Sequence, residues 1–545
     1  MKRSYKIIIC LIIYALVCLI WCNAEKNAGS NTHADRSFHM TDLNKDLKRA
    51  KSEDNYRTTY EIFVYSFCDS NGDGIGDLNG IRSKLDHISD LGFDAIWLTP
   101  VHPSATYHKY DVDDYYSIDP AFGTMEDYEA LLRECHSRGI RVYLDLVLNH
   151  TSEDHEWFKA ASDYLHELPS GWEPDTSYCR YFDYYNFTRQ PADGYTNLDG
   201  TEWYYESGFW SEMPELNLRS EAVRGEIRDI LAYWLDKGVD GFRLDAVTAY
   251  FTGDTESTIE FLNFLKETGC SIDPDCYFAG EAWTDSDNIE TLYTSGIDSL
   301  FDFPFSGREG IIAQTVRGSR TGYDFVREMV QAEEKFGRAC SGYIGAPFYT
   351  NHDMDRSAEY YEDESGSAAK MAYAMSLLMT GNAFVYYGEE IGMNGAGKDE
   401  NRRAPMYWSD TTADPDMCIG PPYMDQVYMK YPPLDDQIND ELAIYRWFAE
   451  VIRVRNAFPA IARGATEAAG TISDDTTAAF FRRSESETDL LIVMNLSPQP
   501  AEKDLSGISE DLKLAAVLDT GMDGIGYRDR ILSMPAYSIA VFTIE

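Results

Sequence analysis

The feature that most constrains the fold is an alternation of short apolar runs with longer amphipathic stretches, which begins at Tyr60. The runs are rich in β-branched and aromatic residues, as buried strands are. Eight of them can be counted: YEIFVYSF (60–67), FDAIWLTP (93–100), RVYLDLVL (141–148), GVDGFRLDAV (238–247), CYFAGEAW (276–283), SLFDFPF (299–305), APFYTNHD (346–353) and AFVYYGEE (383–390). Eight strands that alternate with helices predict an α/β fold, a (β/α)8 TIM barrel.

Helical patterns between these runs carry their own start and stop signals. In TMEDYEALLRECHSRG (124–139), Thr124 is placed as the N-cap, Asp127 follows three residues later, and Gly139 marks the end. EAVRGEIRDILAYWLDKG (221–238) has a similar pattern. Both segments are predicted to be barrel helices.

One interval is too long for a simple barrel connection. Residues 149–237 separate the third and fourth strands, and only the last part is helical in pattern. We therefore predict an inserted lobe at 149–215, between barrel parts at 57–148 and 216–460, with a last barrel helix at 440–458. After it, AAFFRR, DLLIVMNLS, KLAAVLDT and YSIAVFTIE predict a C-terminal antiparallel β-sandwich domain over 461–545.

The N-terminus has the pattern of a secretory signal peptide. A basic start, an apolar run at 7–21 and small residues before position 25 predict a leader at 1–24, cleaved after Ala24. The run is shorter than the roughly 20 residues of a spanning helix, although an uncleaved anchor remains an alternative. The protein is expected to be secreted or held at the cell surface. Residues 25–56 are polar and predict a linker.

Charge and cysteine usage narrow the possible partners. The formal net charge is −45, so the phosphates of nucleic acid would be repelled, and no nucleic acid partner is expected. The ten cysteines form no CxxC or Cys/His zinc spacing. Cys270 and Cys276 are close enough in sequence to pair, but most cysteines are predicted to be small buried residues.

Polar residues gather at the C-terminal ends of the predicted strands, where barrels of this kind place their reactive groups. The third, fourth, fifth and seventh ends supply, in order, Asp145, Asn149 and His150; Arg243 and Asp245; Glu281; His352 and Asp353. Three carboxylates in apolar settings at the fourth, fifth and seventh ends are hard to explain as surface decoration. They predict one polar site at the mouth of the barrel.

The four segments DLVLNH, GFRLDAV, GEAW and TNHD resemble the signature regions of the α-amylase superfamily of retaining glycoside hydrolases. MPELNL (213–218) resembles a further family region, usually MPDLN, in which Glu215 replaces the usual Asp. The stretches 107–124, 149–158 and 385–392 are also similar. The resemblance runs from about Tyr60 to the C-terminus.

The resemblance implies roles for the carboxylates. Retaining glycosidases need two carboxyl groups about 5–5.5 Å apart, one nucleophile and one acid/base. By motif position Asp245 is the nucleophile and Glu281 the acid/base, whose proton requires a raised pKa. Asp353 is the third carboxylate, expected to hold sugar hydroxyls. Arg243, two residues before Asp245 on the same strand face, is expected to keep it ionised.

The same resemblance implies the sugar-binding residues. His150 and His352 are expected to hydrogen-bond the reacting sugar, and Tyr110 to stack on it. Asp111 and Arg403 resemble residues that hold a terminal glucose in oligosaccharide-specific branches. These five complete the predicted substrate site.

The loop CDSNGDGIGDLNG (68–80) contains oxygen donors of the kind that calcium prefers. An EF-hand is disfavoured because Gly80 stands where the loop needs a bidentate Glu, and because a strand precedes it. The superfamily has an ion site of this form in some branches, so the resemblance implies a structural Ca²⁺; a glycine-rich turn with solvated acids is the alternative. The ligands would be Asp69, Asn71, Asp73, Asp77 and the carbonyl of Ile75.

Several activities share these motifs. GEAW and GFRLDAV are more similar to endo-acting α-amylases, which predicts an α-glucan polysaccharide or maltooligosaccharide substrate. An oligosaccharide-directed α-glucosidase or a cyclomaltodextrinase/neopullulanase-type enzyme is the alternative, and LDAV also occurs in trehalose-forming relatives. A non-catalytic family member is a remote alternative, because all three carboxylates are present. No protein partner is implied, and a monomer is expected.

Overall fold

The computed structural model describes residues 37–50, 53–411, 414–521 and 523–544. The predicted signal peptide at 1–24 lies outside these residues. No helix in the described part of the chain is long and apolar enough to cross a membrane.

A curled parallel sheet forms the centre of the molecule. Its strands follow the order β10-β9-β8-β4-β3-β2-β11, and isolated parallel bridges from Phe301 to Ala346 and from Phe348 to Phe384 join its two edges through the segment around 347. The sheet is thereby closed, and the predicted (β/α)8 barrel is confirmed. The strands are β2 (Thr58–Ile62), β3 (Ala95–Leu98), β4 (Arg141–Leu146), β8 (Gly241–Leu244), β9 (Tyr277–Gly280), β10 (Ser299–Leu300) and β11 (Ala383–Tyr386).

All the barrel strands are shorter than their apolar runs, and three of the runs differ most from the prediction. The first ends at Ile62, and the rest of that run is helix α3 (Val64–Phe67). The sixth is reduced to β10, followed by the 3-10 helix η4 (Phe303–Phe305). The seventh pairs only through its two bridges. Buried apolar residues satisfy a helix as well as a strand, so hydrophobicity alone did not fix these boundaries.

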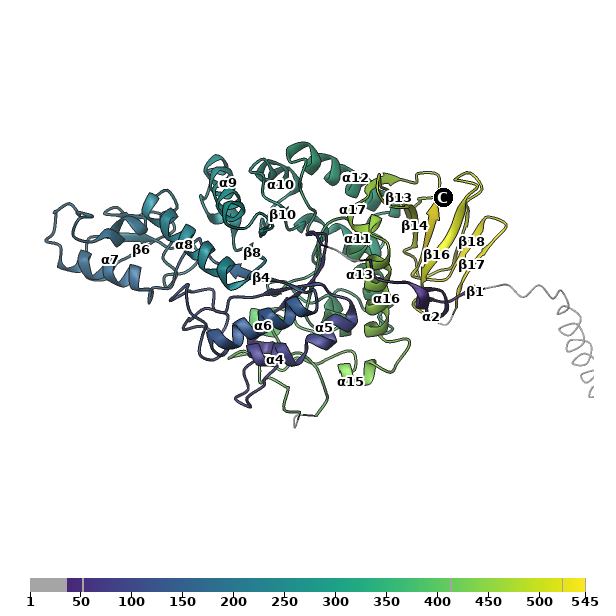
Figure 1. Cartoon of the computed structure of the whole chain (residues 1–545), viewed down its shortest axis with the longest axis horizontal. Coiled ribbons are helices and arrows are strands. Elements are labelled where there is room, and N and C mark those ends of the chain that lie inside the picture. The colour runs from purple at the N-terminus through teal and green to yellow at the C-terminus, as the bar shows by residue number, and fades with distance from the viewer. Residues whose placement is uncertain (1–36, 51–52, 412–413, 522, 545) are drawn as a thin grey trace, which may run out of the picture.

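Helices surround the barrel (Figure 1). In α6, Thr124 and Asp127 form the predicted capping box, and α8 ends at the left-handed Gly238. The larger helices are α4 (Leu78–Ser83), α5 (Leu85–Leu91), α6 (Met125–Ser137), α8 (Glu221–Lys237), α9 (Thr255–Ile272), α10 (Ser286–Tyr293), α11 (Ile311–Val316), α12 (Gly322–Ala339), α13 (Ser367–Leu377) and α16 (Ile444–Ala457). Short ones are η3 (Val247–Ala249), η5 (Ser357–Glu359), η6 (Glu389–Ile391), α14 (Asp399–Arg402), α15 (Leu434–Gln437) and α17 (Ala460–Arg463).

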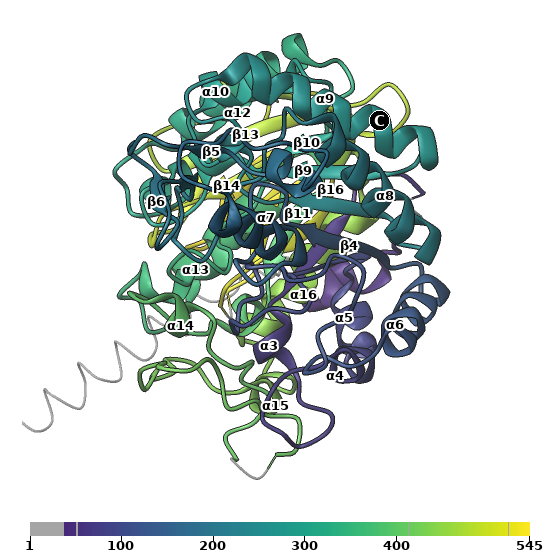
Figure 2. The same cartoon turned by 90° about the vertical axis from the view of Figure 1, so that its left-hand side faces the viewer.

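The segment after β4 forms a lobe at one end of the molecule, as Figure 1 shows. It contains α7 (Glu156–Glu167), η2 (Arg180–Tyr184) and a small antiparallel sheet of order β5-β7-β6. These strands are β5 (Phe187–Thr188), β6 (Tyr195–Asn197) and β7 (Tyr204–Glu206). Seen from that end, the lobe lies in front of the barrel strands (Figure 2).

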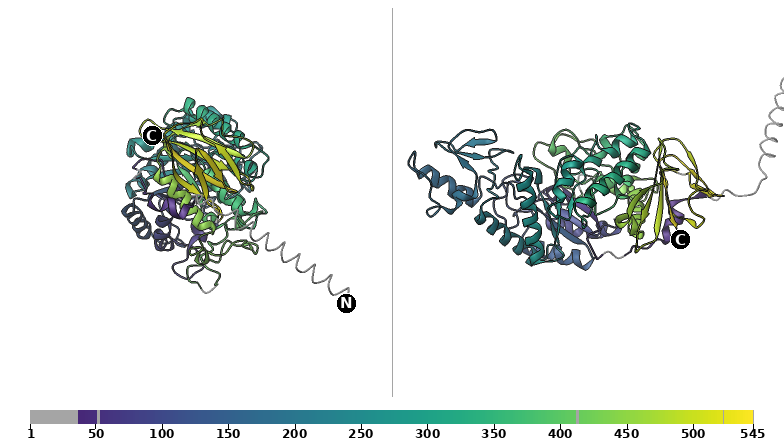
Figure 3. Two further views of the ribbon diagram at one scale, coloured as in Figure 1. Left: turned by 90° about the vertical axis from the view of Figure 1, so that its right-hand side faces the viewer. Right: turned by 90° about the horizontal axis from the view of Figure 1, so that it is seen from above.

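The C-terminal strands form two antiparallel sheets at the opposite end (Figure 3). One has the order β12-β13-β14-β19-β16 and the other β1-β17-β18-β15. Tyr527 and Phe542 meet between them, with ring centroids 4.9 Å apart. The strands are β1 (Ser37–Phe38), β12 (Ala465–Ala468), β13 (Thr477–Arg483), β14 (Asp489–Asn495), β15 (Ala501–Asp504), β16 (Leu512–Leu518), β17 (Ile525–Arg528), β18 (Ile531–Met534) and β19 (Ser538–Ile544).

The prediction of a linker over 25–56 is wrong for residues 37–50. Strand β1 pairs with β17, and α2 (Met40–Leu43) and η1 (Asn44–Asp46) follow it. The side-chain amide of Asn44 donates to the carbonyl of Val517 at 2.8 Å, and Met40 is buried. A polar segment without apolar periodicity is held here by a few specific contacts that are invisible in the sequence.

The described cysteines are all unpaired. Cys270 and Cys276, which are close enough in sequence to form a disulfide, are both free thiols. Burial raises the pKa of the Cys276 thiol well above its ordinary value, so this thiol stays protonated.

Candidate active site

Arg243 is the centre of the polar cluster at the mouth of the barrel. It lies on β8 and is fully buried. Its Nη1 donates to Asp145 at 2.9 Å and to Asp245 at 2.8 Å, and its Nη2 lies 2.6 Å from Glu281. One guanidinium thus joins the ends of β4, β8 and β9 and fixes the two carboxylates predicted to react close to each other.

The backbone after Asp245 is strained in a way that serves the same arrangement. Ala246 has φ 46°, in the left-handed region that residues with a Cβ rarely adopt. Its N–H donates to Glu281 Oε2 at 3.1 Å. Strain of this kind is held only where the surrounding structure imposes it, and it is frequent at active sites.

A second cluster forms around Asp353. His352 Nε2 lies 3.1 Å and Arg403 Nη2 lies 2.6 Å from the two oxygens of this carboxylate. Arg403 Nη1 also donates to the hydroxyl of Tyr107 at 2.8 Å. The predicted third carboxylate is therefore held from both sides by cations.

Tyr110 connects the two clusters. Its hydroxyl donates to Asp145 Oδ2 at 3.0 Å and lies 2.7 Å from His352 Nε2, and its ring is stacked on His352. Beneath them, His352 Nδ1 lies 2.6 Å from Glu61, a buried acid on β2, and the indole of Trp97 donates to Asp145 at 3.1 Å. Most polar groups at the base of the site therefore have a partner.

Burial sets the protonation of the reacting pair. Burial raises the pKa of Asp245 to about 6, against the opposing effect of Arg243 and with further raising by Asp145 and Asp353. Burial also raises the pKa of Glu281, where Arg243 opposes and the charge of Asp245 adds to the rise. A carboxyl group that keeps its proton beside an ionised carboxylate is the arrangement that acid/base catalysis on a sugar requires.

The histidines differ in charge. Burial alone would lower the pKa of His352, but Asp353 and Glu61 raise it to about 10, so this imidazole is charged at neutral pH. For Asp353, burial alone would raise the pKa. The nearby charges of His352 and Arg403 outweigh burial and hold the pKa of Asp353 well below its ordinary value. His150 is different, because burial lowers its pKa to about 4 and leaves it neutral.

These groups surround a cavity of about 430 Å³ that opens to solvent. Most of the residues predicted to react or bind sugar line it, and several that the sequence did not single out join them. The lining includes Tyr110, His150, Asp245, Glu281, Asp353 and Arg403, together with His108, Phe209, Trp210, Met213, Trp283 and Asp399.

Three predicted substrate residues do not line the cavity: Arg243 and His352 are buried in the clusters described above, and Asp111 lies outside both clusters. It is buried away from the cavity, where its carboxylate accepts hydrogen bonds from the hydroxyls of Ser104 and Thr106. The partner that the structure places against Arg403 from this loop is Tyr107. The structure therefore places Arg403, and not Asp111, at the cavity.

Four further groups of the site were missed or left without a role in the sequence. Glu61 stands alone as an acid in an apolar strand, which was a usable signal. Asp145 was noticed at a strand end, but only its contact with Arg243 shows what it does. Trp97 carried no signal, because buried aromatic residues are ordinary in a barrel core. Tyr107 is a partly buried loop residue in the stretch 107–124, and nothing in the sequence assigned it a role.

The loop predicted to bind calcium is built from successive Asx turns. Asn71 N–H donates to Asp69, Asp73 N–H to Asn71, and Ile75 N–H to Asp73, at 2.8–3.0 Å. Asp77 caps α4 by accepting from Gly80 N–H at 2.7 Å. The donor set fits a hard cation in its chemistry. Among the described residues, however, no three acidic, His or Cys side chains already converge as a metal site, so calcium stays a prediction.

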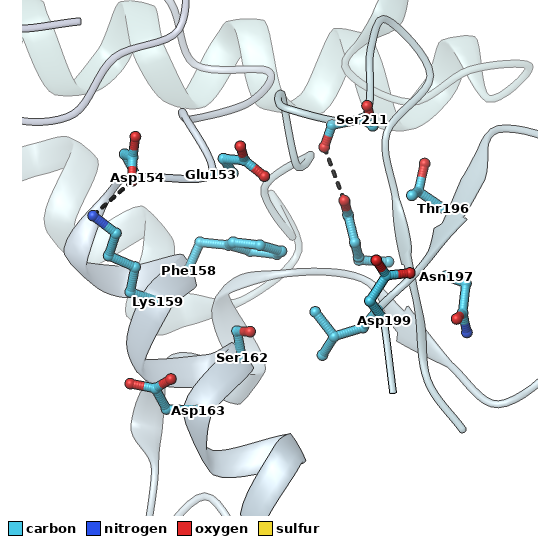
Figure 4. Close-up of a pocket in the computed structure, with 12 residues that line it drawn as sticks. Glu153, Asp154, Phe158, Lys159, Ser162, Asp163, Thr196, Asn197, Asp199 and Ser211 are labelled. Carbon is cyan, nitrogen blue, oxygen red and sulfur yellow. Dashed lines mark hydrogen bonds and ion pairs between the residues drawn. The ribbon is translucent and has the colours of Figure 1, made fainter. Parts of the chain in front are cut away.

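A second hollow, of about 530 Å³, lies in the lobe itself (Figure 4). Its wall is polar and acidic, and it includes the ion pair of Lys159 with Asp154 at 2.7 Å. Tyr205, which also lines it, donates to the carbonyl of Ser211 at 2.9 Å. None of the predicted catalytic or substrate residues lies in this hollow.

Comparisons with known proteins agree with this arrangement. The model of the α-amylase catalytic domain matches residues 61–464. The chain belongs to the α-amylase family. It is 36% identical over 457 residues to "Alpha-amylase 3" of Dictyoglomus thermophilum, covering 80% of this chain and 84% of that protein.

Two other relatives show how broad the likeness is. The structure of Eubacterium rectale Amy13B superimposes with a TM-score of 0.91 at 45% identity, covering 94% of this chain and 99% of that one. An oligo-1,6-glucosidase of Heyndrickxia coagulans is 28% identical over 550 residues, covering 85% of this chain and 95% of that protein. This α-amylase family member is a glycoside hydrolase, and its finer specificity is argued below.

Proposed function

We propose that the protein is a retaining, endo-acting hydrolase of α-1,4-glucosidic bonds in starch-like polysaccharides. The observation that carries the proposal is the guanidinium of Arg243, which holds Asp245 at 2.8 Å and Glu281 at 2.6 Å within one buried cluster. Two carboxyl groups fixed close together are what the retaining mechanism needs, because one must attack the carbon that the other helps to release.

In the first step, Asp245 attacks the anomeric carbon as a carboxylate while the carboxyl proton of Glu281 passes to the leaving glycosidic oxygen. The bond to the leaving sugar breaks, and a covalent glycosyl ester forms on Asp245. This ester is neutral, so the charge that helped to raise the pKa of Glu281 is gone. The pKa of Glu281 therefore falls at the moment when Glu281 must act as a base.

In the second step, Glu281 takes a proton from a water molecule, the oxygen of which attacks the anomeric carbon. The ester bond breaks and Asp245 is released as a carboxylate, with the proton back on Glu281. Asp353 stays ionised throughout, because His352 and Arg403 hold its pKa low. It can accept hydrogen bonds from sugar hydroxyls and favour the positive charge that develops on the ring.

The endo preference rests on two observations. The cavity opens to solvent and carries exposed aromatic side chains at its rim, as a groove for a long chain does. Asp111, the acid expected to close a site around a terminal glucose, is bonded to Ser104 and Thr106 instead. The alternative is an oligosaccharide-directed α-glucosidase or a cyclomaltodextrinase-type enzyme. It is supported by Arg403, which lines the cavity, and by the similarity to an oligo-1,6-glucosidase.

A time course on soluble starch tests the mode of attack. An endo enzyme cuts inside the chain, so iodine colour should collapse while few reducing ends have formed. An exo enzyme would release glucose steadily and leave most of the colour. If free glucose is the main early product, and short maltooligosaccharides are far better substrates than starch, the α-glucosidase proposal would replace the endo proposal.

We also propose export, because the segment 1–24 has a basic start, an apolar run and small residues near Ala24. Export suits an enzyme that acts on polymers too large to enter a cell. Fractionation of the producing cells, with N-terminal sequencing of the mature protein, tests this. A cytoplasmic protein that begins at Met1 would contradict it.

A further inference from the structure

A buried lysine lies in the middle of a loop that forms part of the wall of the catalytic cavity. His108 and Tyr110 both line the cavity, whereas the side chain of Lys109 between them turns the other way, into the core. Only 7% of Lys109 is exposed, although lysine is rarely buried unless it is paired. Burial of an ammonium group is unfavourable without partners, so its contacts show what this residue holds together.

The backbone at Lys109 is strained. Its φ is 66°, in the left-handed region that glycine adopts freely and that residues with a Cβ rarely adopt. Such a conformation persists only where the surrounding contacts impose it. A lysine therefore stands where the backbone alone would favour glycine, which points to a contribution from its side chain.

The side chain of Lys109 forms an ion pair with Asp119. Its Nζ lies 2.7 Å from Oδ2 of Asp119, and each of the two side chains is 8% exposed. The same Nζ lies 5.6 Å from the centroid of the Phe122 ring. Asp119 is itself fixed, because its Oδ1 accepts from the N–H of Ala121 at 2.8 Å and its own N–H donates to the carbonyl of Val101 at 2.8 Å. The ion pair thus ties the middle of the loop to the segment that follows β3.

The same two side chains also hold the start of the loop. Lys109 Nζ donates to the carbonyl of Ser104 at 3.0 Å, and Asp119 Oδ2 accepts from the N–H of Ser104 at 3.3 Å. Both backbone polar groups of Ser104 are therefore bonded to the pair. The loop is closed around one buried pair of opposite charges.

On its other side, the loop contacts both polar clusters of the site. The hydroxyl of Tyr110 donates to Asp145 at 3.0 Å, and the hydroxyl of Tyr107 accepts from Arg403 at 2.8 Å. The N–H of Tyr110 donates to Nδ1 of His108 at 3.2 Å, so the cavity-facing residues are also linked to each other. A shift of the loop would move all of them together, and a misplacement of about 1 Å can lower a rate about a hundredfold.

We infer that Lys109 is a positioning residue for the reaction: paired with Asp119, it holds the loop 104–111 so that its cavity-facing side chains stay against the reacting sugar. The inference rests on the proposed function, because that function places the reacting sugar in this cavity. It holds equally for cleavage inside a chain and at a chain end. Both charged residues act through the loop, since neither lines the cavity.

Two variants separate positioning from stability. Lys109→Met keeps a stem of similar length and the strained backbone, but it leaves the charge of Asp119 buried without its partner, so the melting temperature should fall. Lys109→Met with Asp119→Asn removes both charges and should regain most of that melting temperature. In the double variant, well below its melting temperature, we expect kcat/KM on maltoheptaose to stay about tenfold below wild type, because the middle of the loop is no longer tied.

A second substrate locates the effect. The loss should be similar on α-maltosyl fluoride, because the loop contacts the reacting sugar and not the leaving group. A loss on maltoheptaose alone would place the effect at the leaving group and overturn the inference. Lys109→Gly with Asp119→Asn, which also relieves the strained φ, should show the same loss on both substrates in a protein free of that strain.

Lys266→Met with Asp298→Asn is the matched control. These two side chains form a largely buried ion pair at 2.6 Å, and Asp298 also accepts from the N–H of Phe278 at 2.9 Å. Asp298 directly precedes β10, at the end of the barrel opposite to the catalytic cavity. The control should change the melting temperature and leave kcat/KM unchanged, and an equal loss of kcat/KM in the control would refute the positioning role.

The double variant at Lys109 and Asp119 decides the inference. A merely structural pair would affect the melting temperature alone, so kcat/KM within about twofold of wild type on both substrates would overturn the positioning role and leave the proposed function intact. A wild-type enzyme that cleaves neither substrate would instead remove the proposed function, and the inference with it.

Discussion

Replacing Arg243 by Lys should weaken catalysis and also change its pH dependence. The guanidinium makes contacts with Asp145, Asp245 and Glu281 at once, through two different nitrogens. Lysine keeps the charge but offers one nitrogen on a flexible stem, so we expect it to lose two of these three contacts. At about 1.5 kcal/mol for each hydrogen bond between charged groups, the loss is about 3 kcal/mol, or roughly a hundredfold in kcat/KM.

The pH profile gives the sharper readout. The reactive form of Asp245 is the carboxylate, so kcat/KM should fall on the acid side of its pKa, which is about 6 with Arg243 in place. Arg243 lowers that pKa, so the acid limb should move to higher pH in the variant. A shift of about one pH unit corresponds to about 1.4 kcal/mol of lost stabilisation of the charged form.

The assay is kcat/KM on maltoheptaose across the acid and neutral range, with circular dichroism melting to confirm folding. Arg482→Lys is the control, because Arg482 is equally buried and paired with Glu333 at 3.2 Å, but lies on β13 away from the site. It should lower stability and leave the acid limb in place. A folded Arg243→Lys enzyme with an unmoved acid limb would refute this account of the cluster.

Glu281→Gln should lower kcat/KM on starch by about a thousandfold or more, because the amide has no proton to give. The loss on α-maltosyl fluoride should be far smaller, because the fluoride leaving group needs no proton. Equal losses on the two substrates would contradict the acid role. Chelation of calcium should lower the melting temperature of the wild type and not of Asp73→Ala, and an unchanged wild-type temperature would refute the ion prediction. Removal of residues 1–50 should destabilise the protein by about 2–5 kcal/mol, because the buried Met40 and the hydrogen bond from Asn44 to Val517 are lost beside β16. A truncated protein with the same melting temperature as the full chain would restore the linker interpretation.

Local signals in the sequence predicted the parts of the fold that depend on local chemistry. Thr124 and Asp127 are three residues apart and form their capping box as expected. The run 60–67 was misread after Ile62, because the buried residues Val64 and Phe67 fit a helix as well as a strand. What distinguishes the two is packing against the rest of the barrel, which the sequence does not display.

In the candidate site, too, residues within local motifs could be predicted from the sequence, and contacts between distant segments could not. Asp245 and Glu281 stand at strand ends within recognisable motifs, so they could be named from the sequence. The contact of Glu61 with His352 joins positions 291 residues apart, and it exists only because β2 and the segment before His352 both border the closed barrel. The position of Asp111 could not be predicted for a related reason, because the path of its loop turns the carboxylate toward Ser104.

The most direct test of the central claim is to trap the covalent intermediate and locate it. Incubation with a 2-deoxy-2-fluoro glucosyl fluoride slows the second step more than the first, so the glycosyl ester should accumulate. Peptide mass spectrometry should then find one added fluoroglucosyl group on the peptide that contains GFRLDAV, attached to Asp245. A label on another residue, or an inactivated enzyme without any label, would contradict the assignment of Asp245 as the nucleophile.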